Sequence, residues 1–274
     1  MKSDTKILFT DLDGTLLTSD KKISSTNMDA IKRMTDAGHK FVVATGRPLL
    51  SAYKLCEQYG FVQSGFYIIA SNGGVLYDCS EGRVIDSNSV PFEHVSYIFE
   101  AAADAGIHVH TYSDEHVISL RQTDEVVNYT NIIKMPYKIV ENIPEDLEYE
   151  PPKVIVISHD GHKKLDGFRA SLESWAKDKI QMIFSASTLL EFLPLDSTKG
   201  NGVSKLCKLL DIPIENAIAC GDEENDISMI QTAGIGVVMQ NGTALTKSHA
   251  DYITNATNNE DGIAEVIYKF ILQQ

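Results

Sequence analysis

The sequence predicts an α/β protein: a doubly wound, Rossmann-like parallel-sheet core that carries an inserted α+β cap domain. Three observations lead to this prediction. Short apolar runs alternate with helical patterns near both ends of the chain, the order of elements in parallel α/β sheets. These runs are apolar throughout, as strands covered by helices on both faces are. In the middle, strand-like runs come in adjacent pairs, which is typical of an antiparallel sheet.

The N-terminal elements follow βαβ order. The run KILFT (6–10) predicts a strand, residues 26–38 a helix and residues 39–45 a second strand. Pro48 can open the next helix, because its missing N–H would have no partner in a first helical turn. The run FYIIA (66–70) is then a third buried strand.

The same alternation returns near the C-terminus. The expected elements there are, in order, a helix at 201–212, a strand at 217–222, a helix at 226–234, a strand at 234–239 and a last helix at 262–272. Because this order repeats that of the N-terminal part, residues 1–82 and 189–274 are predicted to form one doubly wound core domain.

Residues 83–188 are predicted to form the cap. The elements expected there are a helix at 92–106, paired strands at 107–112 and 116–120, a helix after Thr123, a strand at 153–158, a helix at 163–178 and a strand at 181–185. Strands in adjacent pairs favour an antiparallel sheet with helices on one face. No motif marks individual residues within this cap.

Composition indicates a folded protein of two domains. The 274 residues are 43% hydrophobic and 23% charged, values typical of globular chains. A formal net charge of −14 repels phosphate backbones and anionic membranes, so we expect neither nucleic acid nor membrane as a partner. No run reaches the ~18 apolar residues of a membrane span, and no secretory leader is seen. We therefore expect a cytoplasmic protein. The sequence does not distinguish a monomer from a homodimer.

Cysteine and histidine do not predict a metal centre. The sequence contains four widely spaced cysteines: Cys56, Cys79, Cys207 and Cys220. This spacing suggests neither a zinc site nor a disulfide framework, so buried thiols are expected. His108 and His110 alternate on one strand face but lack a third ligand at zinc spacing, and we expect them to be surface or packed histidines.

Polar residues follow the apolar runs at the points where parallel strands would place a ligand site. They are Asp11 and Asp13; Thr45, Gly46 and Arg47; Asn72 and Gly73; and Asp222, Asn225 and Asp226. A turn beginning at Gly14 would let Asp11 and Asp13 bind one hard cation such as Mg²⁺, with Asp222 as a third ligand. Taken alone, the DLDG stretch could equally be an acidic turn.

Four motifs together resemble a known family. DLDGT, TGR, Lys199 in STKG, and GDEEND are similar, in order and spacing, to the motifs of the haloacid dehalogenase superfamily of phosphatases. The long insert and the segments that follow it resemble the Cof-type sugar-phosphate phosphatases, which carry a large α/β cap. The resemblance covers both flanks of the chain and is only architectural in the insert.

The resemblance implies a role for each matched residue. Asp11 would be the nucleophile that forms an aspartyl phosphate, and Asp13 the general acid and base. Mg²⁺ would be held by the Asp11 side chain, the Asp13 carbonyl and Asp222. The residues implied around these are Asp226 beside the metal ligands, and Thr45, Gly46, Lys199 and Asn225 on the phosphoryl oxygens.

Other interpretations of the same residues remain open. Arg47, Asn72 and Gly73 could contact the substrate, or could only shape loops. Thr45, Asn225 and Asp226 could cap helices, and Lys199 could be a solvated lysine in a first helical turn. The function expected is a Mg²⁺-dependent phosphatase of small phosphorylated metabolites, most of all sugar phosphates. A phosphosugar mutase using the same intermediate, or a noncatalytic sensor of phosphorylated metabolites, is the alternative.

Overall fold

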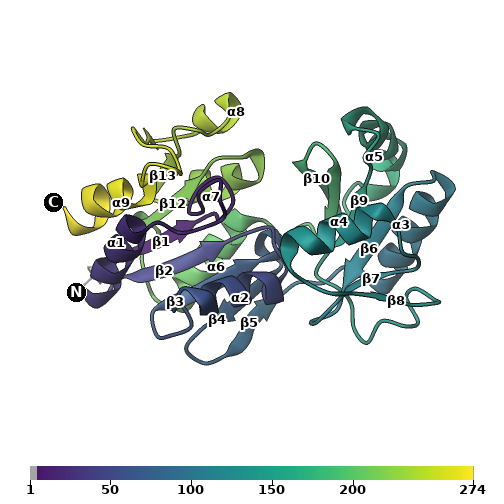
Figure 1. The fold of residues 1–274 in the computed structure, drawn as a ribbon, viewed down its shortest axis with the longest axis horizontal. Coiled ribbons are helices and arrows are strands. Elements are labelled where there is room, and N and C mark those ends of the chain that lie inside the picture. Colours follow the sequence, from purple (N-terminus) through teal and green to yellow (C-terminus); the bar gives the residue numbers. More distant parts are fainter. Residues whose placement is uncertain (1–4, 274) are drawn as a thin grey trace. The chain divides into compact units, whose positions relative to one another are not determined.

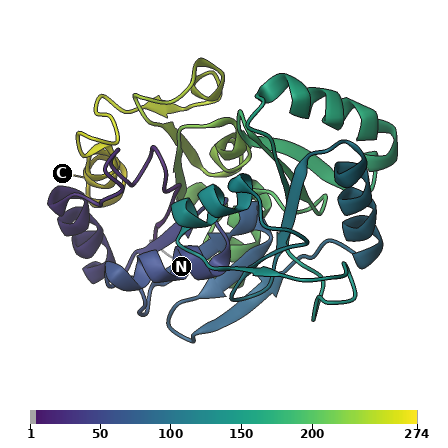
Figure 2. The ribbon, with the colours of Figure 1, turned by 45° about the vertical axis from the view of Figure 1, so that its right-hand side comes forward.

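A computed structural model describes residues 5–273, and these residues form two compact units, each with its own sheet (Figures 1 and 2). The first unit contains the chain up to Gly46, Leu55–Asp86 and the chain from Thr198 onward, and the second contains Arg47–Lys54 and Ser87–Ser197. The α/β class with an inserted domain is the fold that the sequence predicts.

The first unit is built on an eight-stranded sheet in the order β14-β13-β12-β1-β2-β3-β4-β5. Its strands are β1 (Ile7–Thr10), β2 (Lys40–Ala44), β3 (Phe66–Ala70), β4 (Val75–Asp78), β5 (Arg83–Ser87), β12 (Ala217–Gly221), β13 (Ile235–Val238) and β14 (Tyr252–Ile253). All pairings from β14 to β3 are parallel, and β4 pairs antiparallel with β3. The parallel core is therefore as predicted, whereas β4 and β5 extend it beyond the predicted strands.

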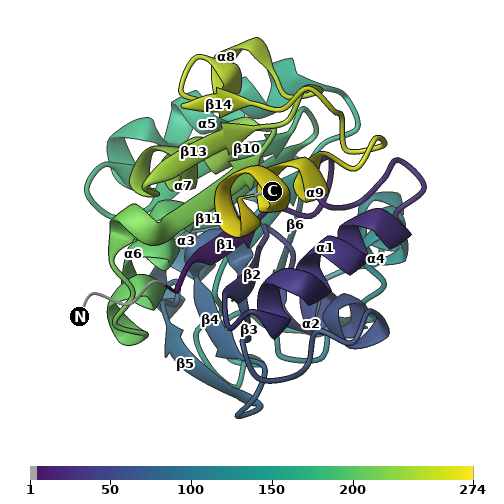
Figure 3. The ribbon, with the colours of Figure 1, turned by 90° about the vertical axis from the view of Figure 1, so that its left-hand side faces the viewer.

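Helices cover both faces of this sheet. Figure 3 shows α6 and α7 on one side and α1 and α9 on the other. The helices of this unit are α1 (Ser25–Asp36), α6 (Lys199–Leu209), α7 (Ile227–Thr232), α8 (Ala244–Lys247) and α9 (Gly262–Val266), and the short turns are η1 (Ser71–Gly73), η2 (Ile214–Asn216), η3 (Glu224–Asp226) and the π-helical η4 (Ile267–Leu272). Helix α2 (Leu49–Gln58) is divided, with its residues up to Lys54 in the second unit and those from Leu55 in the first. Ile7 and Phe9 of β1 pack with Val203 and Leu206 of α6 in one buried cluster.

Local sequence explains where α1 begins and which face it buries. The Ser24 hydroxyl accepts a hydrogen bond from the Asn27 N–H at 3.1 Å, which satisfies a donor of the first turn. Ala30, Ile31 and Met34 lie on one face at helical spacing and are buried. The helix therefore packs one apolar stripe on the core, as its sequence pattern predicts.

The second unit has a six-stranded sheet in the order β10-β11-β9-β6-β7-β8. Its strands are β6 (His108–Tyr112), β7 (Val117–Ser119), β8 (Tyr137–Ile139), β9 (Val154–Ile157), β10 (Gln181–Ala186) and β11 (Leu189–Leu193). All pairings are antiparallel except that of β7 with β8. Because β11 pairs with both β9 and β10, the second unit continues past residue 188 to Ser197.

The sheet of the second unit carries helices on both faces, so the prediction of helices on one face is wrong. The helices are α3 (Phe92–Asp104), α4 (Asp124–Ile133) and α5 (His162–Ala176). Val154 and Val156 of β9 pack with residues of α3 and α5. Ile155 and Ile157 point to the opposite face, because side chains alternate along a strand, and pack with residues of α4.

The four cysteines are buried free thiols, as expected. His108 and His110 are likewise buried in β6, where one ring nitrogen of each lies 3.0 Å from the other. Residues 5–273 contain no helix with the length and hydropathy needed to cross a lipid bilayer.

Candidate active site

The candidate site lies at one edge of the first unit's sheet. Strands β12, β1, β2 and β3 are neighbours and parallel, so their carboxyl ends meet at this edge. Asp222, Asp11, Thr45 and Asn72 come just after these four strands. Backbone bonds keep the strand order beyond the strand ends: the Asp11 N–H donates to the Cys220 carbonyl at 3.0 Å. The topology thus gathers residues from distant parts of the sequence.

Lys199 joins two of the acidic residues. Its Nζ donates to Oδ1 of Asp11 and to Oδ1 of Asp226, both at 2.6 Å. Lys199 is the first residue of α6, whose N-cap Thr198 accepts from the Asn201 N–H at 3.1 Å. The lysine side chain is 0% exposed, which excludes the interpretation of Lys199 as a solvated residue. A buried ammonium of this kind needs the carboxylates around it.

Three buried carboxylates converge beside this lysine. One carboxylate oxygen each of Asp11, Asp222 and Asp226 lies within 4.8 Å of the others. Three carboxylates around one ammonium leave an excess of negative charge in a site shielded from water, which a divalent cation would balance. The donors are all oxygens, the ligand type that Mg²⁺ prefers. The residues present therefore fit a Mg²⁺ site.

The electrostatics of the protein without a cation agree with this view. The pKa of Asp11 is raised to about 8: burial is the main cause, the charge of Lys199 opposes it, and the charges of Asp226 and Asp222 add to it. Burial likewise raises the pKa of Asp222 to about 7. For Lys199, burial lowers the pKa, but the charges of Asp11 and Asp226 more than offset it, so the pKa lies above its ordinary value. A bound cation favours the ionised carboxylates.

Thr15 and Gly14 hold Asp222 in place. The Thr15 hydroxyl, fully buried, donates to Oδ1 of Asp222 at 2.6 Å. Gly14 has a φ of +89°, and a Cβ added there would lie 2.3 Å from Oδ2 of Asp222. Asn241 donates to the Gly14 carbonyl at 2.8 Å. Sequence reasoning missed Thr15 and Asn241; only the position of Thr15 beside the two aspartates in DLDGT could have indicated it.

Asp226 has two functions in the loop after β12. Its Oδ2 accepts from the backbone N–H groups of Asp222 at 2.9 Å and Glu223 at 3.1 Å, while Oδ1 contacts Lys199. The interpretation of Asp226 as a side-chain cap of the following helix is wrong, because its carboxylate makes no capping hydrogen bond to α7. Asp226 instead forms a capping box with Glu223 at η3, which shapes the turn that positions Asp222. The same carboxylate belongs to the buried cluster.

Asp13 lies at the edge of this arrangement. Its side chain is 39% exposed, and it accepts from Nζ of Lys21 at 2.7 Å. The backbone of Asp13 forms a bridge with Leu17, in the loop that joins β1 to α1. Its assignment as the acid and base stays a prediction.

The remaining predicted residues fall into two groups. In the first unit, Asn225 donates from Nδ2 to Oδ1 of Asn72 at 3.1 Å, and Asn72 packs against Gly46. Arg47 belongs to the second unit. Burial raises the pKa of Tyr129, and the charge of Arg47 opposes this rise in part. The roles of Thr45, Gly46 and Asn225 on phosphate, and of Arg47 on substrate, stay predictions.

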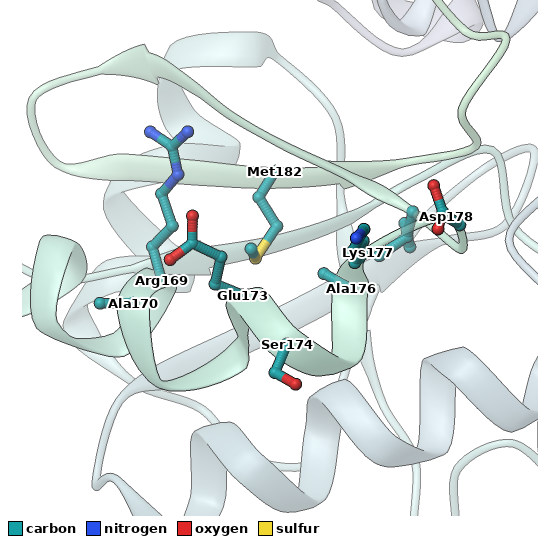
Figure 4. Close-up of a pocket in the computed structure, with 9 residues that line it drawn as sticks. Arg169, Ala170, Glu173, Ser174, Ala176, Lys177, Asp178 and Met182 are labelled. Carbon is teal, nitrogen blue, oxygen red and sulfur yellow. The ribbon is translucent and has the colours of Figure 1, made fainter.

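A shallow groove of about 630 Å³ also lies on the second unit, between α5 and β10 (Figure 4). Arg169, Glu173 and Met182 are among its lining residues, and Figure 4 shows their side chains along it. None of the residues predicted for the site lines this groove. The chemistry that the sequence predicts is therefore concentrated at the end of the first unit's sheet.

The fold and the buried cluster define an α/β enzyme core with an inserted domain. The chain belongs to the family described as haloacid dehalogenase-like hydrolases, whose pattern matches residues 8–267. This confirms the resemblance to the haloacid dehalogenase superfamily and its Cof-type phosphatases.

Similar proteins agree with this assignment. A protein of Streptococcus pyogenes serotype M6 that is named as a phosphatase is 30% identical over 270 residues, covering 97% of this chain and 98% of that protein. A 5-amino-6-(5-phospho-D-ribitylamino)uracil phosphatase of Bacillus subtilis is 28% identical over 291 residues, covering 98% and 99%. The crystal structure of a haloacid dehalogenase-like hydrolase from Bacteroides thetaiotaomicron matches with a TM-score of 0.89 at 31% identity, covering 97% and 99%. The chain is thus an enzyme of the phosphatase type.

Proposed function

We propose that this protein is a Mg²⁺-dependent phosphatase that hydrolyses small phosphorylated metabolites, with sugar phosphates as the leading class, through an aspartyl phosphate on Asp11. The observation that carries the proposal is the fully buried Lys199, which lies 2.6 Å from Asp11 and 2.6 Å from Asp226 at the end of the central strands. A lysine between two carboxylates holds the nucleophile in a fixed position.

Two carboxyl groups supply the chemistry. A carboxylate oxygen of Asp11 attacks phosphorus, the bond to the leaving alkoxide breaks, and Asp13 gives that oxygen a proton. Water then attacks the aspartyl phosphate, Asp13 takes a proton from it, and inorganic phosphate leaves Asp11 free. The exposure of Asp13 beside Lys21 supports a group that exchanges protons with solvent.

The other residues of the site would bind and orient the phosphoryl group and hold the metal ion. Lys199, Thr45, Gly46 and the Asn225 amide would donate to the phosphoryl oxygens, where negative charge spreads during transfer. The residues that would hold Mg²⁺ are Asp11, the carbonyl of Asp13 and Asp222, with Asp226 beside them. When bound, the ion lets an anionic carboxylate approach an anionic phosphoryl group.

The substrate class rests on charge and on one relative. An overall charge of −14 disfavours a nucleic acid, whereas a small phosphate ester needs only the local cations of the site. The Bacillus subtilis relative is named for 5-amino-6-(5-phospho-D-ribitylamino)uracil, a small metabolite whose phosphate is carried by a ribityl chain. Free cysteines support the expected cytoplasmic location, where thiols stay reduced.

A phosphate-release panel tests this function. Sugar phosphates, nucleotides and pyridoxal phosphate are incubated with the wild-type protein, with and without Mg²⁺, beside Asp11→Asn. We expect release that requires Mg²⁺ and falls at least about 10³-fold in the variant, because the nucleophile is lost. The matched control is Asp104→Asn, a change at an exposed aspartate of α3, which should keep full activity.

Each alternative gives a different result. An isomeric sugar phosphate formed without free phosphate identifies a mutase. Metabolite binding without any turnover identifies a sensor. Equal release by wild type and Asp11→Asn on every substrate rejects the proposed phosphatase.

A further inference from the structure

The side chain of Asn72 connects two loops of the candidate site. Nδ2 of Asn225 donates to Oδ1 of Asn72 at 3.1 Å. On the other side, a Cβ added to Gly46 would lie 3.2 Å from the same oxygen. Asn72 is 2% exposed. It therefore lies between the loop after β2 and the loop after β12, both of which carry residues proposed to bind phosphate.

The backbone at Asn72 is strained. Ser71, Asn72 and Gly73 have φ values of +50°, +54° and +97°, so three consecutive residues lie in the left-handed region. Such a conformation costs free energy in a residue other than glycine and persists only where the surroundings impose it. The Asn72 N–H donates to the Thr45 carbonyl at 3.0 Å. Strain of this kind is most often kept where it positions a functional group.

The same turn also packs tightly against the start of α6. A Cβ added to Gly73 would lie 2.2 Å from the carbonyl oxygen of Thr198. Thr198 is the N-cap of α6 and directly precedes Lys199. The left-handed turn is therefore in contact with the N-terminus of α6 and with the loop that carries Asn225.

We propose that Asn72 is a positioning residue for phosphoryl transfer, which acts by holding one amide hydrogen of Asn225 so that the other points at the phosphoryl group. An amide nitrogen carries two hydrogens in fixed directions. Because Oδ1 of Asn72 accepts a hydrogen bond from one of the two amide hydrogens of Asn225, the direction of the other amide hydrogen is fixed. This inference rests on the proposed function. It gives Asn72 the role of orienting Asn225, rather than of contacting the leaving group.

The strained backbone allows a sharp test. Asn72→Gly keeps the left-handed conformation, which glycine adopts freely, and removes the side chain that carries the acceptor. With p-nitrophenyl phosphate and Mg²⁺, we expect kcat to fall about tenfold, the size of one lost hydrogen bond, with KM within about threefold. The matched control is Asp211→Gly, an exposed residue of the same unit with a φ of +52°, which should keep wild-type kcat.

A double-mutant cycle shows whether Asn72 acts through Asn225. In an Asn225→Ala background, Asn72→Gly should change kcat by less than about twofold, because the group that it positions is gone. A role confined to folding would instead lower kcat by the same factor in both backgrounds.

The inference is overturned if Asn72→Gly has wild-type kcat, or if its effect is unchanged in the Asn225→Ala background. Failure of the proposed function itself is distinguishable. In that case the wild-type protein releases no phosphate from any substrate and the cycle has no reference activity.

Discussion

Lys199 and Asp11, which are 188 residues apart in the chain, form an ion pair with 2.6 Å between Nζ and Oδ1. The pair is buried, and Asp226 completes it from the other side. Taking charges out of water is costly, and the cost is offset only while every partner is present. The stability of this unit and its chemistry therefore depend on the same side chains.

Lys199→Met should destabilise the metal-free protein. The change leaves two carboxylates buried without their counter-ion, which costs about 3–5 kcal/mol of unfolding free energy. Added Mg²⁺ should restore part of the loss, because it binds only the folded form. Urea unfolding with EDTA or with Mg²⁺ measures both effects.

Lys205→Met on the same helix is the control. Lys205 pairs with Asp86 with both side chains 36% exposed, and such partly exposed pairs contribute about 0–1 kcal/mol. Equal losses of unfolding free energy in Lys199→Met and Lys205→Met would contradict a special contribution of the buried ion pair.

Thr15→Val should weaken metal binding. Valine keeps the shape of threonine but cannot donate to Oδ1 of Asp222. Loss of a hydrogen bond to a metal ligand costs about 10–100-fold in affinity, so the Mg²⁺ concentration for half-maximal activity should rise by that factor. Thr15→Ser keeps the hydroxyl and should therefore keep most of the wild-type affinity for Mg²⁺. An unchanged Mg²⁺ requirement in Thr15→Val would show that the bond is not needed.

Gly14→Ala should sharply reduce activity, and Gly38→Ala should not. Both glycines have left-handed φ values, +89° and +91°, and no described heavy atom lies within 4 Å of a Cβ added to Gly38. Each change therefore adds strain of about 1–2 kcal/mol. Only at Gly14 does the new methyl group also collide with Asp222, at 2.3 Å from Oδ2.

Comparing the two glycine variants separates the effect of the clash with Asp222 from the effect of backbone strain, which both variants share. Displacement of Asp222 should lower kcat/KM by at least about 100-fold, measured alongside the urea midpoint of each variant. Similar activity in the two variants would mean that the loop can move away without cost.

His108 should make stability depend on pH. Burial lowers the pKa of this histidine to about 4, while in the unfolded chain it is about 6.5. Above pH 6.5 both states are neutral and the contribution to stability is complete. Between pH 6.5 and 4 the unfolded chain binds a proton that the folded chain does not, so stability falls by about 1.4 kcal/mol per pH unit.

Replacing the histidine tests this dependence. His108→Gln should reduce the loss of stability between pH 7 and pH 4.5, measured by urea unfolding. The control is Gln122→Asn, a change at an exposed residue of the same unit that carries no titratable group, which should leave the slope as in wild type. A slope unchanged by His108→Gln would assign the pH dependence to other groups, and His110, whose pKa burial also lowers, would be examined next.

The strand ends explain why much of this site could be predicted from the sequence. A buried parallel strand is a continuous apolar run, so the polar residue after it can be identified locally, and neighbouring strands end at one edge. Asp11 and Asp222 were found in this way, and the structure places both beside Lys199. The lysine itself is carried by a helix start, and only the resemblance to a family pointed to it.

Contacts between distant loops could not be predicted. A hydroxyl such as that of Thr15 has the same sequence signature whether it meets solvent or Asp222. Asn72 and Asn225 are 153 residues apart, and no local pattern records that they touch. For the same reason, the position of α4 on the second face of its sheet is set by non-local packing, and the sequence pattern alone did not reveal it.

The order of strands has a consequence for the newly synthesised chain. β1 is made first, but β12, its neighbour on one side, begins at Ala217. The whole segment Ser87–Ser197 leaves the ribosome in between, and domains generally fold as units as they emerge. A nascent chain that ends before Asp226 contains Asp11 but lacks the complete loop after β12 that lies beside it in the folded protein. We therefore expect no phosphatase activity from the nascent chain until the loop through Asp226 has been translated.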